Sequence, residues 1–191
     1  MTLVLEQGPD GEPVGLDEVK AYLRLDDVAG QEGVLTILLA AARMALEAET
    51  RRVFMSQGLR YIESDLAAKR IVVPVAPVSA VTEVGFLMPG GSIAPFAPEA
   101  WRVMLKAGDP VIELDAARTP VVPETNPVGI AVRFTAGYGA AADVPAPLRQ
   151  GILQLIAHWF EHREAVTCDG PSAPLPASLD KLVAPYRRWR L

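Results

Sequence analysis

Cysteine, histidine and long apolar runs are scarce in this sequence of 191 residues, which holds one cysteine, Cys168, and two histidines. A single cysteine excludes an internal disulfide and a zinc site built from several cysteines, and it fits a reducing compartment. The longest strongly apolar run lies around Val34 to Ala42, far short of the roughly 20 residues that a membrane-spanning helix needs. We therefore expect no membrane-spanning segment.

The N-terminal residues also lack the features of a secretory signal. The segment MTLVLEQGPDGEPVG has no basic start, no continuous apolar stretch and no small-residue cleavage site. The net charge is -5, which gives no general attraction to nucleic acid or to anionic lipid. We expect a protein made in the cytoplasm, whose contacts with DNA are local or weak.

The composition is that of an ordinary globular protein, with 50% hydrophobic and 21% charged residues. A chain of this length can bury one sizeable core without needing a second. A single domain spanning residues 1–191 is the expectation.

Proline marks where helices are permitted, because it lacks the backbone N–H that a helix interior requires. Residues 14–73 contain no proline, and their apolar residues recur at helical spacing. The first such group is Leu16, Val19 and Leu23, and the second is Leu35, Leu38, Leu39, Ala42, Leu46 and Val53. Two helices are predicted here. Acidic residues at the start of the second and Arg51 and Arg52 at its end suit the helix dipole.

Nine of the seventeen prolines lie between Pro74 and Pro127, interleaved with short runs of β-branched and aromatic residues. This pattern is typical of strands and turns. The predicted strands are Leu59 to Ser64, Ile71 to Val73, Val81 to Phe86, Trp101 to Leu105, Val111 to Leu114 and Ile130 to Thr135. Pro89-Gly90-Gly91 predicts a tight turn, and Pro120 to Pro127 an irregular exposed loop.

Helical spacing returns after Asp143, which can cap a helix while Pro145 occupies its first turn. Pro171, Pro174 and Pro176 then predict an extended linker before a short last helix capped by Ser178. The predicted fold class is α+β: mainly an α-helical bundle, made of N-terminal helices plus a C-terminal helix, with an inserted antiparallel β region. Its expected parts are helical segments at 14–56 and 143–166, a β-rich insertion at about 57–137, and a linker and tail at 167–191.

His158, Glu161 and His162 form the H-x-x-E-H pattern of inverted zinc peptidases. Two histidines four positions apart share one helix face, where they could hold zinc while the glutamate polarised a water. Catalytic zinc normally takes a third protein ligand, and only Glu164, Asp169 and Asp180 follow as candidates. The favoured interpretation places both histidines on a solvated or subunit-facing side. We therefore predict no catalytic residue, no metal ligand and no cofactor, with a zinc-dependent hydrolase as the alternative.

The chain ends in Tyr186, Arg187, Arg188, Trp189, Arg190 and Leu191. Aromatic and arginine side chains are the ones that most often anchor in a partner's pocket, and arginine also binds phosphate. Three interpretations remain open: the tail folds back on its own core, it docks on a partner protein, or it contacts DNA. The last would make the chain a small DNA-binding assembly factor.

Three segments, taken together, resemble the head-tail connector (adaptor) proteins of tailed bacteriophages and phage-derived gene transfer agents. The opening is LDEVKAYLRL at 16–25 with the helix ending near Thr50-Arg51-Arg52, and the entry to the strands is VPVAPVSAV at 73–81. The C-terminal hallmark combines FTAGYG at 134–139, VPAPLRQ at 144–150 and HWFEHRE at 158–164. This family often has asparagine where His162 stands, which weakens a metal role there.

The resemblance implies a structural subunit and no enzyme. Such subunits form a homo-oligomeric ring, usually of twelve copies, below the portal protein at one capsid vertex. A stopper or tail terminator protein binds on the tail side, and DNA passes through the channel without specific binding. The resemblance further implies a location in the neck of a phage-like particle assembled in the bacterial cytoplasm, and a terminal segment that docks on the portal. Our hypothesis assigns Tyr186 to Leu191 to this docking role, because these anchor-type residues follow a proline-rich linker.

Overall fold

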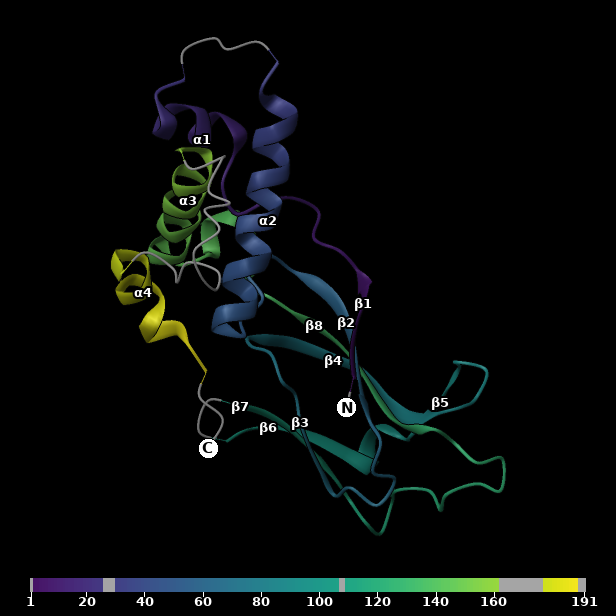
Figure 1. The fold of residues 1–191 in the computed structure, drawn as a ribbon. Helices are drawn as coiled ribbons and strands as arrows, with labels where there is room; N and C mark the ends of the chain where they lie inside the picture. Colours follow the sequence, from purple (N-terminus) through teal and green to yellow (C-terminus); the bar gives the residue numbers. More distant parts are fainter. Residues whose placement is uncertain (1, 26–29, 107–108, 162–176, 189–191) are drawn as a thin grey trace, which may run out of the picture. The chain divides into compact units, whose positions relative to one another are not determined.

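The computed structural model describes residues 2–25, 30–106, 109–161 and 177–188 (Figure 1). The chain divides into two compact units, each built from two separate stretches of sequence. We call Met1–Pro9 with Ser56–Tyr138 the strand unit, and Asp10–Met55 with Gly139–Leu191 the helical unit.

The helical unit contains the two helices predicted before residue 73 and the two predicted after Asp143. They are α1 (Leu16–Leu23), α2 (Glu32–Thr50), α3 (Ala146–Glu161) and α4 (Ala177–Val183), with 3-10 turns at Ala141–Asp143 and Ala184–Tyr186. Asp143 does not cap α3 in the way predicted. Its carboxylate accepts the N–H of Ala140 at 2.9 Å, while the N–H of Leu148 bonds to the Pro145 carbonyl at 2.9 Å.

The core of the helical unit lies where α2, α3 and α4 pack together. Gly151 of α3 permits this packing, because a Cβ there would lie 3.2 Å from Leu179 and 3.3 Å from Leu46. The buried apolar residues follow the predicted spacing. They are Val19 of α1; Leu35, Leu39, Ala42 and Leu46 of α2; Leu148, Ile152, Leu155 and Ile156 of α3; and Leu179 and Val183 of α4. Leu153 of α3 is buried as well, outside the predicted spacing.

The strand unit consists of two antiparallel sheets. The first has the order β1 (Thr2–Gln7), β2 (Gln57–Glu63), β8 (Gly129–Ala136), β4 (Val78–Leu87) and β5 (Ile93–Pro95). The second has the order β3 (Arg70–Val72), β7 (Asp109–Leu114) and β6 (Trp101–Lys106), and a 3-10 turn at Pro98–Ala100 leads into β6. Figure 1 shows β8 running between β2 and β4.

The central strand β8 carries the cleanest predicted alternation, and Ile130, Val132 and Phe134 are buried as expected. Ala131, on the opposite face, is buried as well. Only Arg133 and Thr135 remain partly exposed. The first half of β8 is therefore buried on both faces, while its two edges pair with β2 and β4.

The prediction of a mainly helical bundle is wrong. Within the described residues the protein is sheet-rich, with eight strands in two antiparallel sheets beside four helices. All six predicted strands are present, and the structure adds β1 and β5. Helical spacing is a strong local signal, whereas short strands depend on distant partners, so the local pattern overstated the helices. Among the described helices, none is long and apolar enough to cross a bilayer.

The two predicted turn regions are confirmed. Met88 and Ser92 close the turn at Pro89-Gly90-Gly91 through a 2.9 Å hydrogen bond, and Gly91 has the positive φ of +83° that favours glycine. The segment from Pro120 to Pro127 holds no helix or strand, and Val121 in it is 91% exposed.

Gly85 fixes how closely β5 approaches β4. A Cβ at this position would lie 2.2 Å from the Ala94 carbonyl oxygen and 2.7 Å from the Pro95 Cα, both backbone atoms that cannot rotate away. We expect Gly85→Ala to cost about 1–3 kcal/mol of stability and to displace β5. The readout is hydrogen exchange at the Phe96 amide, which bonds to the Val84 carbonyl at 2.8 Å.

Gly90→Ala is the matched control, because no atom lies within 4 Å of its Cβ position. Exchange at Phe96 should be unchanged in this control and clearly faster in Gly85→Ala. Equal exchange in the two variants would contradict the assigned role of Gly85.

Candidate interaction surfaces

Four charged side chains form a row across four strands of the five-stranded sheet; we call Glu6, Arg60, Arg133 and Glu83 the charge row. Arg60, Arg133 and Glu83 stand opposite one another on β2, β8 and β4. Arg133 donates to Glu6 on β1 at 2.6 Å and also pairs with Glu83, while Arg60 lies 3.2 Å from Glu6. The charges balance, so the row ties β1 to the middle of the sheet without adding net charge.

The electrostatics of the row favour the ionised forms. The hydrogen bond from Arg133 lowers the pKa of Glu6 despite the opposing effect of burial, and the same bond raises the pKa of Arg133. A carboxyl group whose pKa is lowered by folding adds stability above its ordinary pKa. That stability is lost as the pH falls through the lowered value.

We expect Glu6→Gln to loosen β1 at neutral pH, because the ion pairs to Arg133 and Arg60 are lost. Hydrogen exchange in Leu3 to Leu5 should become about two- to fivefold faster, the effect of a partly exposed ion pair. Glu124→Gln, in the exposed loop 120–127, is the control and should leave β1 exchange unchanged. A wild-type exchange rate in Glu6→Gln would show that β1 is held by its backbone pairing alone.

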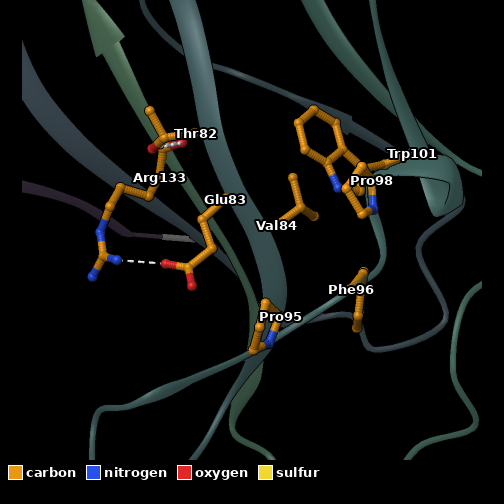
Figure 2. Close-up of a pocket in the computed structure, with 8 residues that line it drawn as sticks. All are labelled: Thr82, Glu83, Val84, Pro95, Phe96, Pro98, Trp101 and Arg133. Atoms are coloured by element: carbon orange, nitrogen blue, oxygen red, sulfur yellow. Dashed lines mark hydrogen bonds and ion pairs between the residues drawn. The ribbon is translucent and has the colours of Figure 1, made fainter.

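A hollow of about 380 Å³ lies beside the charge row in the strand unit, lined by Thr82, Glu83, Val84, Pro95, Phe96, Pro98, Trp101 and Arg133. Figure 2 shows the Arg133–Glu83 pair on one side and Trp101 with Pro98 on the other. The Thr82 hydroxyl donates to the Arg133 carbonyl at 3.1 Å. One charged wall and one aromatic wall suit a single anchoring side chain from a partner protein.

A second hollow of about 420 Å³ also borders Trp101, on the side of Arg102, Glu113 and Arg118. Glu113 accepts hydrogen bonds from Arg70 at 2.9 Å and from Arg102 at 2.7 Å. The bond from Arg102 is the main reason that the pKa of Glu113 is lowered. Most of the charged groups that line the two hollows are therefore already engaged in pairs.

The H-x-x-E-H pattern falls at the end of α3. His158 is partly buried and Glu161 is exposed, while His162, Glu164 and Asp169 lie outside the described residues. Asp180, another candidate third ligand, is bonded to Arg187 at 2.6 Å. Within the described ranges, no three His, Cys, Asp or Glu side chains are grouped to hold a metal.

The described part of the predicted tail lies against the C-terminal end of α2. Arg187 bonds to Glu49 and Asp180, each at 2.6 Å. Arg52 donates to the Tyr186 carbonyl at 2.7 Å, with its guanidinium 5.9 Å from the centre of the Tyr186 ring. The Arg188 N–H satisfies the Thr50 carbonyl at 3.2 Å, one of the carbonyls that a helix end leaves without a partner.

These contacts fix Tyr186 to Arg188 on the chain's own helical unit. Trp189, Arg190 and Leu191 lie outside the described residues. The predicted tail thus divides into a segment bound to α2 and the three residues that follow it.

Neither a protein-family model nor a curated protein matches the chain. Several solved structures do match the chain. The chain resembles a chain in the neck of an empty gene transfer agent particle, computed with C6 symmetry, with a TM-score of 0.81 and 27% sequence identity over 100% of this chain and 97% of that chain.

Two further matches have the same identity and coverage. One is in the virion of a native gene transfer agent particle, with a TM-score of 0.79, and the other is in the neck of a native particle computed with C12 symmetry, with a TM-score of 0.75. The likeness spans both units and includes the sequence. These matches are neck and virion structures of gene transfer agent particles, and they support a protein of the head-tail connector or neck family.

The resemblance read from the sequence is therefore confirmed, although two surfaces of the chain were missed. In the sequence, the only sign of the charge row was Arg133 within an otherwise apolar strand. The residues opposite Arg133 lie on strands that are far away in the sequence. The second surface is the outer face of α2, where apolar residues such as Ile37 are exposed. Its signal was the rarity of charge between Glu32 and Glu47.

Proposed function

We propose that the chain is a structural head-tail adaptor subunit. Copies of it form a ring in the neck, between the portal protein and a tail-side stopper or tail terminator protein. The ring encloses part of the DNA channel, and the subunit performs no chemical step. The whole chain, strand unit and helical unit together, acts as one adaptor domain.

The observation that carries this proposal is the end-to-end match to a neck chain, at 27% identity over 100% of this chain and 97% of that chain. Structures of such necks computed with C6 and with C12 symmetry support a ring of copies. The surface of the strand unit is consistent with assembly, because the hollow beside Trp101 has room for a side chain from another protein.

Deletion of the gene in a particle-producing strain tests the role. We expect DNA-containing heads without attached tails, because the portal would lack the ring that receives the tail. Electron microscopy of purified particles gives the readout, and a plasmid copy of the gene should restore tailed particles. Normal tailed particles from the deletion strain would reject the proposal.

Within this role, Tyr186 to Leu191 is proposed as the portal-docking segment. The support is its aromatic and arginine side chains and the bonds of Arg187 to Glu49 and Asp180, which hold the start of the segment in one place. Portal docking then depends on the residues beyond Arg188. A deletion that begins after Arg188 can therefore test portal docking without removing the contacts described for Tyr186 to Arg188.

Removal of Trp189, Arg190 and Leu191 is expected to weaken binding to the purified portal at least about tenfold, the loss typical of an anchoring aromatic residue. The thermal midpoint should stay unchanged, since every contact described for Tyr186 to Arg188 remains. Lys181→Ala, on the exposed side of α4, is the control and should bind normally. Full portal binding by the shortened chain would reject portal docking by these residues.

The net charge of -5 suits a conduit through which DNA slides without sticking. We expect no shift of duplex DNA by the purified chain at physiological salt. A shift that disappears steeply as salt is raised would instead favour a DNA-binding assembly factor.

A further inference from the structure

The outer face of α2 carries an apolar stripe, which we define as Val34, Ile37, Ala41, Met44 and Ala48. These residues alternate at spacings of three and four, the spacing of helices that pack side by side along their length. Val34, Ile37 and Met44 are 46%, 70% and 62% exposed. The stripe covers fifteen residues of α2, from Val34 to Ala48, or about 21 Å along the helix axis.

No charged side chain interrupts this stripe. All four charged residues of α2 form ion pairs within the chain. Glu32 pairs with Lys20, Arg43 pairs with Glu12 and Glu47, and Glu49 pairs with Arg187. The Thr36 hydroxyl is bonded within the helix, because it donates to the Glu32 carbonyl at 2.8 Å. A helix at the surface of a soluble protein normally has charged residues on its outer face. An uncharged, apolar outer face of this kind is instead typical of a helix that packs against a further polypeptide segment.

We propose that the apolar stripe packs against a neighbouring copy of this chain. The inference rests on the proposed ring, in which every subunit has a copy on each side. A chain with net charge -5 repels its own copies, so an uncharged contact surface suits a lateral interface between copies. Ala41 and Ala48 permit the close approach of a facing element, and the stripe would form the apolar centre of a larger interface with a polar rim.

Photo-crosslinking in assembled particles tests this directly. p-Benzoylphenylalanine is placed at position 37 in cells that make particles, and the purified particles are irradiated. We expect a product of twice the mass of one chain. Mixing isotopically light and heavy copies should give hybrid crosslinked peptides, which prove that two copies are joined. The same group at Lys181, exposed on α4, is the control position.

The outcomes separate the inference from the proposed function. If the chain is absent from particles, the proposed function fails. If the chain is present but position 37 crosslinks to a different protein, to residues 162–176 of its own copy, or to nothing, the inference alone is overturned.

A second variant guards against disturbance by the bulky probe. Ile37→Lys combined with Met44→Lys should leave the thermal midpoint of the isolated chain unchanged, because both side chains are already exposed. Its incorporation into particles should fall at least tenfold. Val121→Lys, at a position that is 91% exposed in the strand unit, should be incorporated normally. Normal incorporation of the double variant would also overturn the inference.

Discussion

Replacing Arg43 with methionine is expected to lower the free energy of unfolding by about 3–5 kcal/mol, the cost of leaving a buried charge without its partner. Arg43 is only 8% exposed and bonds to Glu12 at 2.7 Å and to Glu47 at 2.8 Å. The other oxygen of Glu47 accepts the Phe54 N–H at 2.7 Å. The cluster thus joins α2 to the segments before and after it. Urea unfolding followed by circular dichroism gives the measurement.

The loss in the Arg43→Met variant should depend on pH. Burial raises the pKa of Glu47, and it outweighs the lowering by the Phe54 amide and Arg43. Without Arg43 that pKa rises further, so the folded state takes up a proton more readily than the unfolded state. Stability therefore recovers as the pH falls through the raised value. The deficit should be larger at pH 8 than at pH 5.

Glu47→Gln added to Arg43→Met is the matched control. The glutamine keeps an oxygen for the Phe54 N–H and removes the unpaired charge, so the double variant should regain most of the lost stability. The assigned role of Arg43 would be contradicted if the single variant matched wild type. A deficit that neither pH nor Glu47→Gln reduced would contradict it as well.

Phe134→Ala is expected to destabilise the strand unit by about 3–5 kcal/mol through the cavity that it leaves. Phe134 is 1% exposed in β8, between Leu59 of β2 and Val81 of β4. Loss of its ring removes packing at the strand that joins both halves of the sheet. Hydrogen exchange of the amides in Gly129–Ala136 reports the free energy of opening of this sheet.

Two further substitutions serve as comparisons for the Phe134→Ala variant. Phe134→Leu keeps most of the apolar volume and should lose much less stability than the alanine variant. Val121→Ala, at a position that is 91% exposed, should change stability by no more than about 0.5 kcal/mol. If Phe134→Ala behaved like Val121→Ala, the central packing role of β8 would be wrong.

The sequence predicted most of the helices and strands, but it did not predict that the described part of the protein is sheet-rich. The spacing of Leu35, Leu39 and Leu46 is a local signal, and α2 lies where it was expected. β1 and β5 were missed because their evidence is not local. β1 pairs with β2, more than fifty positions away, and β5 has only three residues beside a turn. Such strands become recognisable only when their partners are known.

The contacts and surface residues also fall into those that the sequence could predict and those that it could not. Arg43 could be placed on the core face of α2, since it follows Leu39 by four positions and precedes Glu47 by four. Its partner Glu12 could not be predicted, because it comes from an irregular segment before α1. The family resemblance was visible in motifs such as FTAGYG at 134–139. The tail residues were named from composition, and only the structure separated Tyr186 to Arg188, which bind α2, from the residues after them.

A reconstruction of the particle neck at side-chain resolution tests the central claim most directly. The account predicts a ring of copies of this chain between portal and tail, with the apolar stripe of α2 covered by the adjacent copy. A neck whose density is fully explained by other proteins, with this chain found nowhere in the particle, would contradict it.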